Sequence, residues 1–194
     1  DIIMELNFKN KTAIITGGAS GMGYLTGECL AKEGANVLLV DVNAEALAEK
    51  CRQINAFGAG RAIWKVCDVR DYDQICQARD LAIAEFGSID ILINCAGIIT
   101  SNKTFDLQTE DEILRTMKIN TIAPMLVARA MLPDMLKRNR GHICTIASAG
   151  GMLSNPKMSV YAASKWGVIG WSDSVRIELQ EMKSKVRITT VAPY

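Results

Sequence analysis

Short apolar runs alternate with longer amphipathic runs along the whole chain. The short runs are rich in β-branched residues, as expected for strands that are buried on both faces. They lie near 11–16, 36–41, 61–67, 89–94, 141–147 and 186–191. The longer runs have helical periodicity and lie near 21–33, 43–55, 71–86, 109–138 and 157–183. This regular order of strand and helix predicts a parallel sheet with helices on both faces.

The alternation predicts a single α/β domain that spans residues 1–194. Right-handed crossovers between successive strands give a doubly wound sheet of the Rossmann type, with strand order 3-2-1-4-5-6. Ligands of such sheets bind beyond the carboxyl ends of the strands. Five residues of suitable chemistry lie at or just after these expected ends: Gly17, Asp41, Asp68, Asn94 and Ser148. We therefore expect the functional site at this edge of the sheet.

The first strand is followed at once by a glycine-rich turn and then by a helical pattern. The turn carries Gly17, Ser20, Gly21, Met22 and Gly23. Glycines let the backbone turn sharply and approach a pyrophosphate, to which the helix start offers N–H groups and a positive dipole. A glycine-rich turn by itself is often only a turn, but the flanking strand and helix favour a dinucleotide cofactor.

Asp41 ends the second strand, 18 residues after Gly23. This is close to the separation of about 20 expected for the acid that holds the adenosine ribose. A carboxylate accepts hydrogen bonds from ribose hydroxyls and repels a 2′-phosphate, and Val42 and Asn43 supply no cation beside it. Ser20 supplies none in the glycine turn. The sequence thus favours NAD over NADP, with the alternative that Asp41 only caps the helix beginning near Asn43.

Tyr161 and Lys165 are four residues apart, and Ser148 lies 13 positions before Tyr161. In a helix, residues i and i+4 share one face, so the ammonium lies near the phenol. A free tyrosine has a pKa of about 10, and a nearby positive charge favours its phenolate form. A Ser148 hydroxyl beside them can hydrogen-bond the reacting oxygen. An ordinary amphipathic helix with a Tyr and a Lys is the alternative, and the pair gains weight from the cofactor site.

Several motifs occur in a fixed order from about Phe8 to the last residue. They are Thr16-Gly17-x-x-x-Gly21-x-Gly23, Asp68-Val69, Asn94-Cys95-Ala96-Gly97, Asn120, Ser148, Tyr161-x-x-x-Lys165 and Pro193. With these motifs the chain resembles the short-chain dehydrogenases/reductases. The resemblance implies an NAD(P)-dependent oxidoreductase that acts on alcohols and carbonyls.

The resemblance also assigns roles to individual residues. It implies that Tyr161 is the acid/base, that Lys165 holds the nicotinamide ribose and tunes Tyr161, and that Ser148 orients the substrate oxygen. Asn120 would position a water chain behind Lys165, and a bend at Pro124 would turn Asn120 toward the site. The expected cofactor-binding residues, with Asp68 on the adenine, are Gly17, Ser20, Gly21, Met22, Gly23, Asp41, Asp68, Val69, Asn94, Ala96, Gly97, Tyr161, Lys165 and Pro193.

Three positions depart from the family's pattern. Cys95 stands where a second Asn is frequent, and Ala147 stands where a Ser often precedes Ser148. After Pro193 the family usually continues with Gly and some 50 residues that cover the substrate, so we expect the substrate lid to be missing from this sequence. Met152, Leu153 and Met158 are expected to line one wall of the pocket. They favour a hydrophobic secondary alcohol or ketone, with a sugar alcohol or a 3-oxoacyl thioester left open.

Composition excludes several other classes of function. The net charge of +1 gives no electrostatic case for nucleic acid or an acidic membrane. No apolar run reaches the roughly 18 residues of a membrane span, and acidic Asp1 and Glu5 are not typical of a secretory signal. The six cysteines and the single His142 lack metal-ligand spacing. We therefore expect a cytoplasmic protein without a metal site, its cysteines being small core residues.

Two other classes of protein are compatible with the cofactor motif. One is a regulatory module that senses NAD without catalysis, and the other is a structural subunit that needs no cofactor. The set Asn120, Ser148, Tyr161 and Lys165 favours the enzyme, since a sensor does not need a tuned phenol. The resemblance further implies that the two long helices near 109–138 and 157–183 meet their copies in a homodimer or homotetramer.

Overall fold

The computed structural model describes residues 6–194, so Asp1 and Glu5, on which the expectation of no secretory signal rests, lie outside the described residues. The strands of this part of the chain are β1 (Thr12–Thr16), β2 (Asn36–Asp41), β3 (Ala62–Val66), β4 (Ile91–Asn94), β5 (His142–Ile146) and β6 (Arg187–Val191). The α-helices are α1 (Gly21–Lys32), α2 (Ala44–Asn55), α3 (Tyr72–Phe86), α4 (Glu110–Met117), α5 (Ala123–Lys137) and α6 (Ser159–Glu181).

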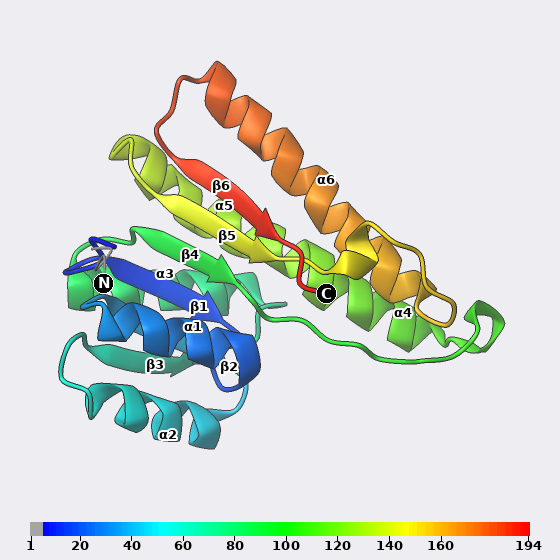
Figure 1. Ribbon diagram of the computed structural model, residues 1–194, viewed down its shortest axis with the longest axis horizontal. Helices are drawn as coiled ribbons and strands as arrows, with labels where there is room; N and C mark the ends of the chain where they lie inside the picture. The colour runs from blue at the N-terminus through cyan, green and yellow to red at the C-terminus, as the bar shows by residue number, and fades with distance from the viewer. Residues whose placement is uncertain (1–5) are drawn as a thin grey trace, which may run out of the picture.

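The strands form one sheet in the order β3-β2-β1-β4-β5-β6, and every neighbouring pair is parallel. This confirms the predicted doubly wound topology. Figure 1 shows α1 and α2 on one face of the sheet, α3 and α5 on the other, and α6 running beside β6. All carboxyl ends of the strands point to the same edge (Figure 1), which is the edge where the sequence predicts the site.

Both faces of the central strands are buried because consecutive side chains point to opposite sides. On one face Ile14 of β1 and Leu38 of β2 pack in a cluster with residues of α3 and α5. On the other face their neighbours Ile15 and Leu39 pack against α1 and α2. All four side chains are at most 1% exposed. The wholly apolar strands of the sequence therefore correspond to a sheet that is covered on both sides.

The helix expected near 109–138 is divided by a turn of π-helix. The chain begins α4 with a capping box between Thr109 and Glu112, and Lys118–Ile122 then form the π-helical turn before α5. The sequence predicts a bend at Pro124, and the structure has the π-helical turn directly before that proline. The reason is that proline lacks an N–H and its ring crowds the carbonyl four residues earlier, which is that of Asn120.

None of the helices within residues 6–194 combines the length and the apolar character needed to cross a membrane.

Candidate active site

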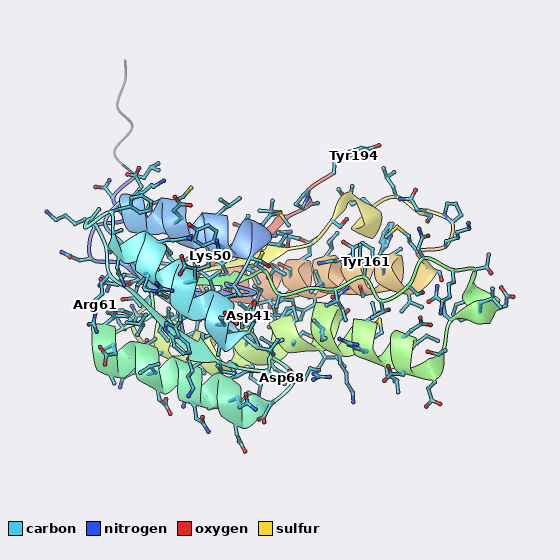
Figure 2. All side chains as sticks on the ribbon, turned by 90° about the horizontal axis from the view of Figure 1, so that it is seen from below. Asp41, Lys50, Arg61, Asp68, Tyr161 and Tyr194 are labelled. Atoms are coloured by element: carbon cyan, nitrogen blue, oxygen red, sulfur yellow. The ribbon has the colours of Figure 1, made fainter. Side chains whose placement is uncertain are left out.

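A groove of about 370 Å³ opens beyond the carboxyl ends of the strands. It runs from the turn after β3, past the glycine-rich turn, to the loop that follows β4. Ten of the predicted cofactor residues line it: Gly17, Ser20, Gly21, Met22, Gly23, Asp41, Asp68, Val69, Ala96 and Gly97. Figure 2 shows Asp41 and Asp68 close together on one side of this region, and Tyr161 and Tyr194 on the other.

The glycine-rich turn leaves no room for side chains at two positions. A Cβ on Gly23 would lie 2.2 Å from the carbonyl oxygen of Gly17. Gly17 has a φ of 68°, in the left-handed region, and a Cβ there would lie 2.9 Å from the backbone of Ala96. These two glycines therefore let the turn pack tightly on the protein itself, whereas Gly21, at the amino end of α1, lines the groove and has open space at its Cβ position.

Asp41 connects the glycine-rich turn to the start of α2. Its Oδ1 accepts hydrogen bonds from the backbone N–H of Val42 at 2.7 Å and of Asn43 at 3.3 Å, and its Oδ2 accepts one from Ala19 at 3.3 Å. The cap of α2 is Asn43, whose side chain accepts from the N–H of Ala46. Asp41 is thus held in place on the groove wall, while the capping of α2 belongs to Asn43.

Asn94 does not line this groove. Its side chain is 2% exposed, and Nδ2 donates to the carbonyl of Pro124 at 3.2 Å, so it joins β4 to α5. The loop after β4 is instead tied to β1 by Thr16, whose hydroxyl accepts from the N–H groups of Cys95 at 3.0 Å and Ala96 at 3.1 Å. The sequence analysis names Thr16 only as part of the glycine-rich motif. A hydroxyl side chain at the end of a buried apolar strand is the feature that could have indicated its role in holding the loop after β4.

A second cavity, of about 310 Å³, contains Tyr161 and Ser148. A Cβ on Gly150 would lie 3.4 Å from the Tyr161 ring and 3.5 Å from the Ser148 hydroxyl, so both side chains border the same small space. Gly150 donates its N–H to Ser148 Oγ at 3.1 Å. The backbone of Pro193 accepts from the N–H of Ala149 at 2.7 Å and thereby closes the end of this turn.

Lys165 lies between the two cavities. Its Nζ is 5.8 Å from the centroid of the Tyr161 ring and donates to the carbonyl of Ile146 at 2.9 Å. A Cβ on Gly97, which lines the first groove, would lie 3.5 Å from the same Nζ. The side chain is buried, and this burial lowers the pKa of Lys165 from that of an ordinary lysine. The predicted face-sharing of Tyr161 and Lys165 on one helix is observed.

Asn120 is held by hydrogen bonds at both ends of its amide. Oδ1 accepts from the N–H of Ile98 at 2.8 Å, while Nδ2 donates to the Ile98 carbonyl at 2.8 Å and to Ser164 Oγ at 3.1 Å. Ser164 in turn donates to the carbonyl of Tyr161 at 2.7 Å. The π-helical turn is thus joined to the first turn of α6 through Ser164, a residue that the sequence analysis missed because serine is common in helices.

The described residues contain no group of three or more His, Cys, Asp or Glu side chains that could hold a metal ion. All six cysteines are free, and His142 Nε2 lies 2.8 Å from the hydroxyl of Thr189 on the neighbouring strand. The thiols of Cys51 and Cys67 are buried, which raises their pKa to about 12 and about 11. Thiols in this state are inert core groups.

Comparison with known proteins agrees with the fold. Residues 11–194 match the family model for short chain dehydrogenase. The chain is 34% identical to short-chain dehydrogenase/reductase family 16C member 6 of Bos taurus, covering 93% of this chain and 57% of that protein. It is 39% identical to ketoacyl reductase HetN of Nostoc sp., covering 94% of this chain and 62% of that protein. It thus spans about three fifths of these relatives.

Solved structures of short-chain dehydrogenases/reductases also have this fold. A short-chain dehydrogenase/reductase from Burkholderia phymatum in complex with NAD superposes with a TM-score of 0.93 at 28% identity, over 97% of this chain and 66% of that one. A metagenomic short-chain oxidoreductase in complex with NADP gives 0.89 at 32% identity, over 96% and 83%. The chain belongs to the short-chain dehydrogenase/reductase family.

Proposed function

We propose that this protein is an NAD-dependent oxidoreductase that transfers hydride between nicotinamide and an alcohol or ketone. One observation carries the proposal: Lys165 Nζ lies near both Gly97, which lines the first groove, and the ring of Tyr161, which borders the second cavity with Ser148. In the groove, the glycine-rich turn packs tightly on the protein at Gly17 and Gly23 and leaves the position of Gly21 open, at a helix start that suits a pyrophosphate. These features fit a dinucleotide, and relatives that bind NAD or NADP support this choice.

Tyr161 is the proposed acid/base. In the oxidation direction its phenolate accepts the hydroxyl proton of the alcohol while hydride leaves the carbinol carbon. In the reduction direction the phenol returns that proton to the carbonyl oxygen. The ammonium of Lys165 stabilises the phenolate, and the Ser148 hydroxyl donates to the substrate oxygen as charge develops there. Bound NAD supplies the hydride chemistry itself, which no side chain of the protein offers.

Asn120 has a positioning role in this proposal. Its amide is fully engaged with Ile98 and Ser164, so it holds the loop after β4 against α6. Lys165 and Asn120 approach the same point beside Gly97. Proton exchange between Lys165 and solvent by way of a water beside Asn120 fits this arrangement.

The first test is a titration with NADH followed by its fluorescence, and then turnover assays with NADH or NAD and a panel of alcohols and ketones. Saturable binding and turnover are the expected results. A module that only senses NAD would bind NADH and turn over no substrate, and a structural subunit would give no fluorescence change.

Replacing Asp41 with alanine is expected to narrow the difference in affinity between NADH and NADPH. The carboxylate repels a 2′-phosphate, and its loss removes both this repulsion and a ribose acceptor. We therefore expect weaker NADH binding and stronger NADPH binding in parallel titrations. Asp106, an exposed acid on the distant turn Phe105–Leu107, is a suitable control for loss of one negative charge. An unchanged ratio in Asp41→Ala would remove Asp41 from cofactor selection.

The cavity beside Tyr161 supports a substrate with apolar carbon groups. Leu153, Met158 and Ala162 line it, together with Tyr194 and the polar side chain of Asn155. Met152, which the sequence placed on this wall, is exposed and does not line the cavity. Because the chain spans only part of its relatives, we propose that further residues complete the cover of this pocket. The intact mass of the native protein tests this proposal.

We also propose a cytoplasmic homodimer or homotetramer without a nucleic-acid or membrane partner. Trp166 and Ile177 on α6 are about half exposed, and their separation of 11 residues (177 − 166) places them on one face of the helix. Contact between copies through this helix would bury them. Sedimentation of the wild-type protein is expected to give twice or four times the monomer mass, and an Ile177→Lys variant is expected to shift it toward monomer. A monomeric wild-type protein would contradict this.

A further inference from the structure

Arg70 forms a fork-shaped ion pair with Asp68 at the end of the groove farthest from Tyr161. Arg70 Nε is 2.9 Å from Asp68 Oδ1 and 3.0 Å from Oδ2, and Nη2 is 2.5 Å from Oδ2. The backbone N–H of Arg70 also donates to Oδ1 at 2.9 Å. Both carboxylate oxygens are therefore occupied by one guanidinium, whose plane is set by the pair.

The turn beneath this pair is fixed by other contacts. The N–H of Asp68 donates to Gln74 Oε1 at 2.9 Å, and Gln74 Nε2 donates to Asp71 Oδ2 at 2.9 Å. Asp71 is the N-cap of α3 and accepts from the first N–H groups of that helix. The fold of the turn thus does not depend on the Arg70 side chain, which is 46% exposed. An exposed pair of this kind contributes little to stability.

Apolar side chains accompany this ion pair in the lining of the groove. They are Val69 from the turn after β3, Ile98 from the loop after β4, and Ile119 from the π-helical turn. Arg70 and Arg115 line the same groove. Apolar side chains suit the faces of a flat aromatic ring, and a guanidinium stacks well on the face of such a ring.

We propose that Arg70 is a binding residue for the adenine of the cofactor, with its guanidinium held by Asp68 and stacked on the purine. The proposal rests on the proposed function, because it assigns the adenine end of the same groove. In this proposal Asp68 and Arg70 position the base together. The affinity for adenine therefore depends on the planar guanidinium of Arg70 as well as on the carboxylate of Asp68.

Arg70→Ala tests the proposal by titration with three ligands: NADH, AMP, and reduced nicotinamide mononucleotide, which lacks the adenosine. We expect affinity for NADH and AMP to fall about 3- to 30-fold, the range of a stacked cation, and affinity for the mononucleotide to stay unchanged. Arg70→Lys keeps the charge but loses the planar fork, so it should show most of the same loss. Arg79→Ala is the matched control, since Arg79 pairs with Asp80 on the surface of α3.

Three results would overturn the assignment of Arg70. AMP binding that is equal in the variants of Arg70 and Arg79 would show no contact with the base. Wild-type affinity in Arg70→Lys would show that charge alone suffices. An equal loss for the mononucleotide would show general damage to the groove. A wild-type protein that binds none of the three ligands would instead refute the proposed function itself.

Discussion

Tyr161→Phe is expected to lose most turnover, by about 10²–10⁴-fold, and to bind NADH as the wild-type protein does. The substitution removes only the hydroxyl that exchanges the substrate proton, and general acid–base help of this kind contributes a factor of that size. The ring keeps its place beside Gly150 and Lys165. Turnover is measured as the change in NADH absorbance, and binding as the change in NADH fluorescence.

The matched control for this substitution is Tyr72→Phe. Tyr72 lies at the start of α3, where its ring stacks with Arg129, away from the cavity. This variant should keep full turnover. Normal turnover by Tyr161→Phe would exclude Tyr161 as the acid/base, and loss of NADH binding would show that the substitution damages the groove.

Lys165→Met is expected to lose turnover by at least about 10²-fold and to unfold at a higher temperature than the wild-type protein. The substitution removes the positive charge that lies 5.8 Å from the centroid of the Tyr161 ring. The stability effect has the opposite sign because the buried ammonium is the unfavourable form in the folded protein. Methionine has a similar length and fills the same apolar path without charge.

The pH dependence of stability follows from the lowered pKa of Lys165. The folded protein binds this proton more weakly than the unfolded chain does, so protonation destabilises the fold. This destabilisation by protonated Lys165 is fully present at neutral pH. It disappears as the pH rises from the pKa of Lys165 in the folded protein to the ordinary pKa of lysine in the unfolded chain. The unfolding temperature of Lys165→Met is therefore expected to exceed that of the wild-type protein at neutral pH. This difference should shrink under alkaline conditions.

The pH-dependent difference in unfolding temperature is measured by thermal unfolding at several pH values. The proteins compared are the wild type, Lys165→Met and Lys137→Met. Lys137 is exposed at the end of α5 and controls for the loss of one lysine. Retained turnover in Lys165→Met would contradict the proposed role in catalysis. A lower unfolding temperature at neutral pH would show that the hydrogen bond to Ile146 outweighs the cost of burial.

The strands, their order and the groove could be predicted because their signals are local. Apolar runs mark strands that are covered on both faces, and Gly17 and Gly23 mark two positions of the turn where a Cβ would clash with backbone. Each strand begins and ends within two residues of the predicted limits. The spacing of Tyr161, Lys165 and Ser148 predicted the reacting end of the site, and the family resemblance added Asn120 and Pro193.

Features that depend on contacts between distant segments were not predictable in this way. The side chain of Asn94 turns toward Pro124, away from the groove, because it lies at a strand position facing α5. Ser164 connects Asn120 to the backbone of Tyr161 only when two helices pack together. The fork of Arg70 on Asp68 joins residues only two positions apart, but it depends on the shape of the turn between β3 and α3.

The most direct test of the central claim is a crystal structure of the protein with bound NAD. The account predicts a nicotinamide ring beside Lys165 and Gly97, with its hydride-accepting carbon facing the cavity that Tyr161 and Ser148 border. A substrate carbon placed between them would lie about 3–3.5 Å from that acceptor. A dinucleotide whose nicotinamide lies away from the hydroxyl of Tyr161 would contradict the account.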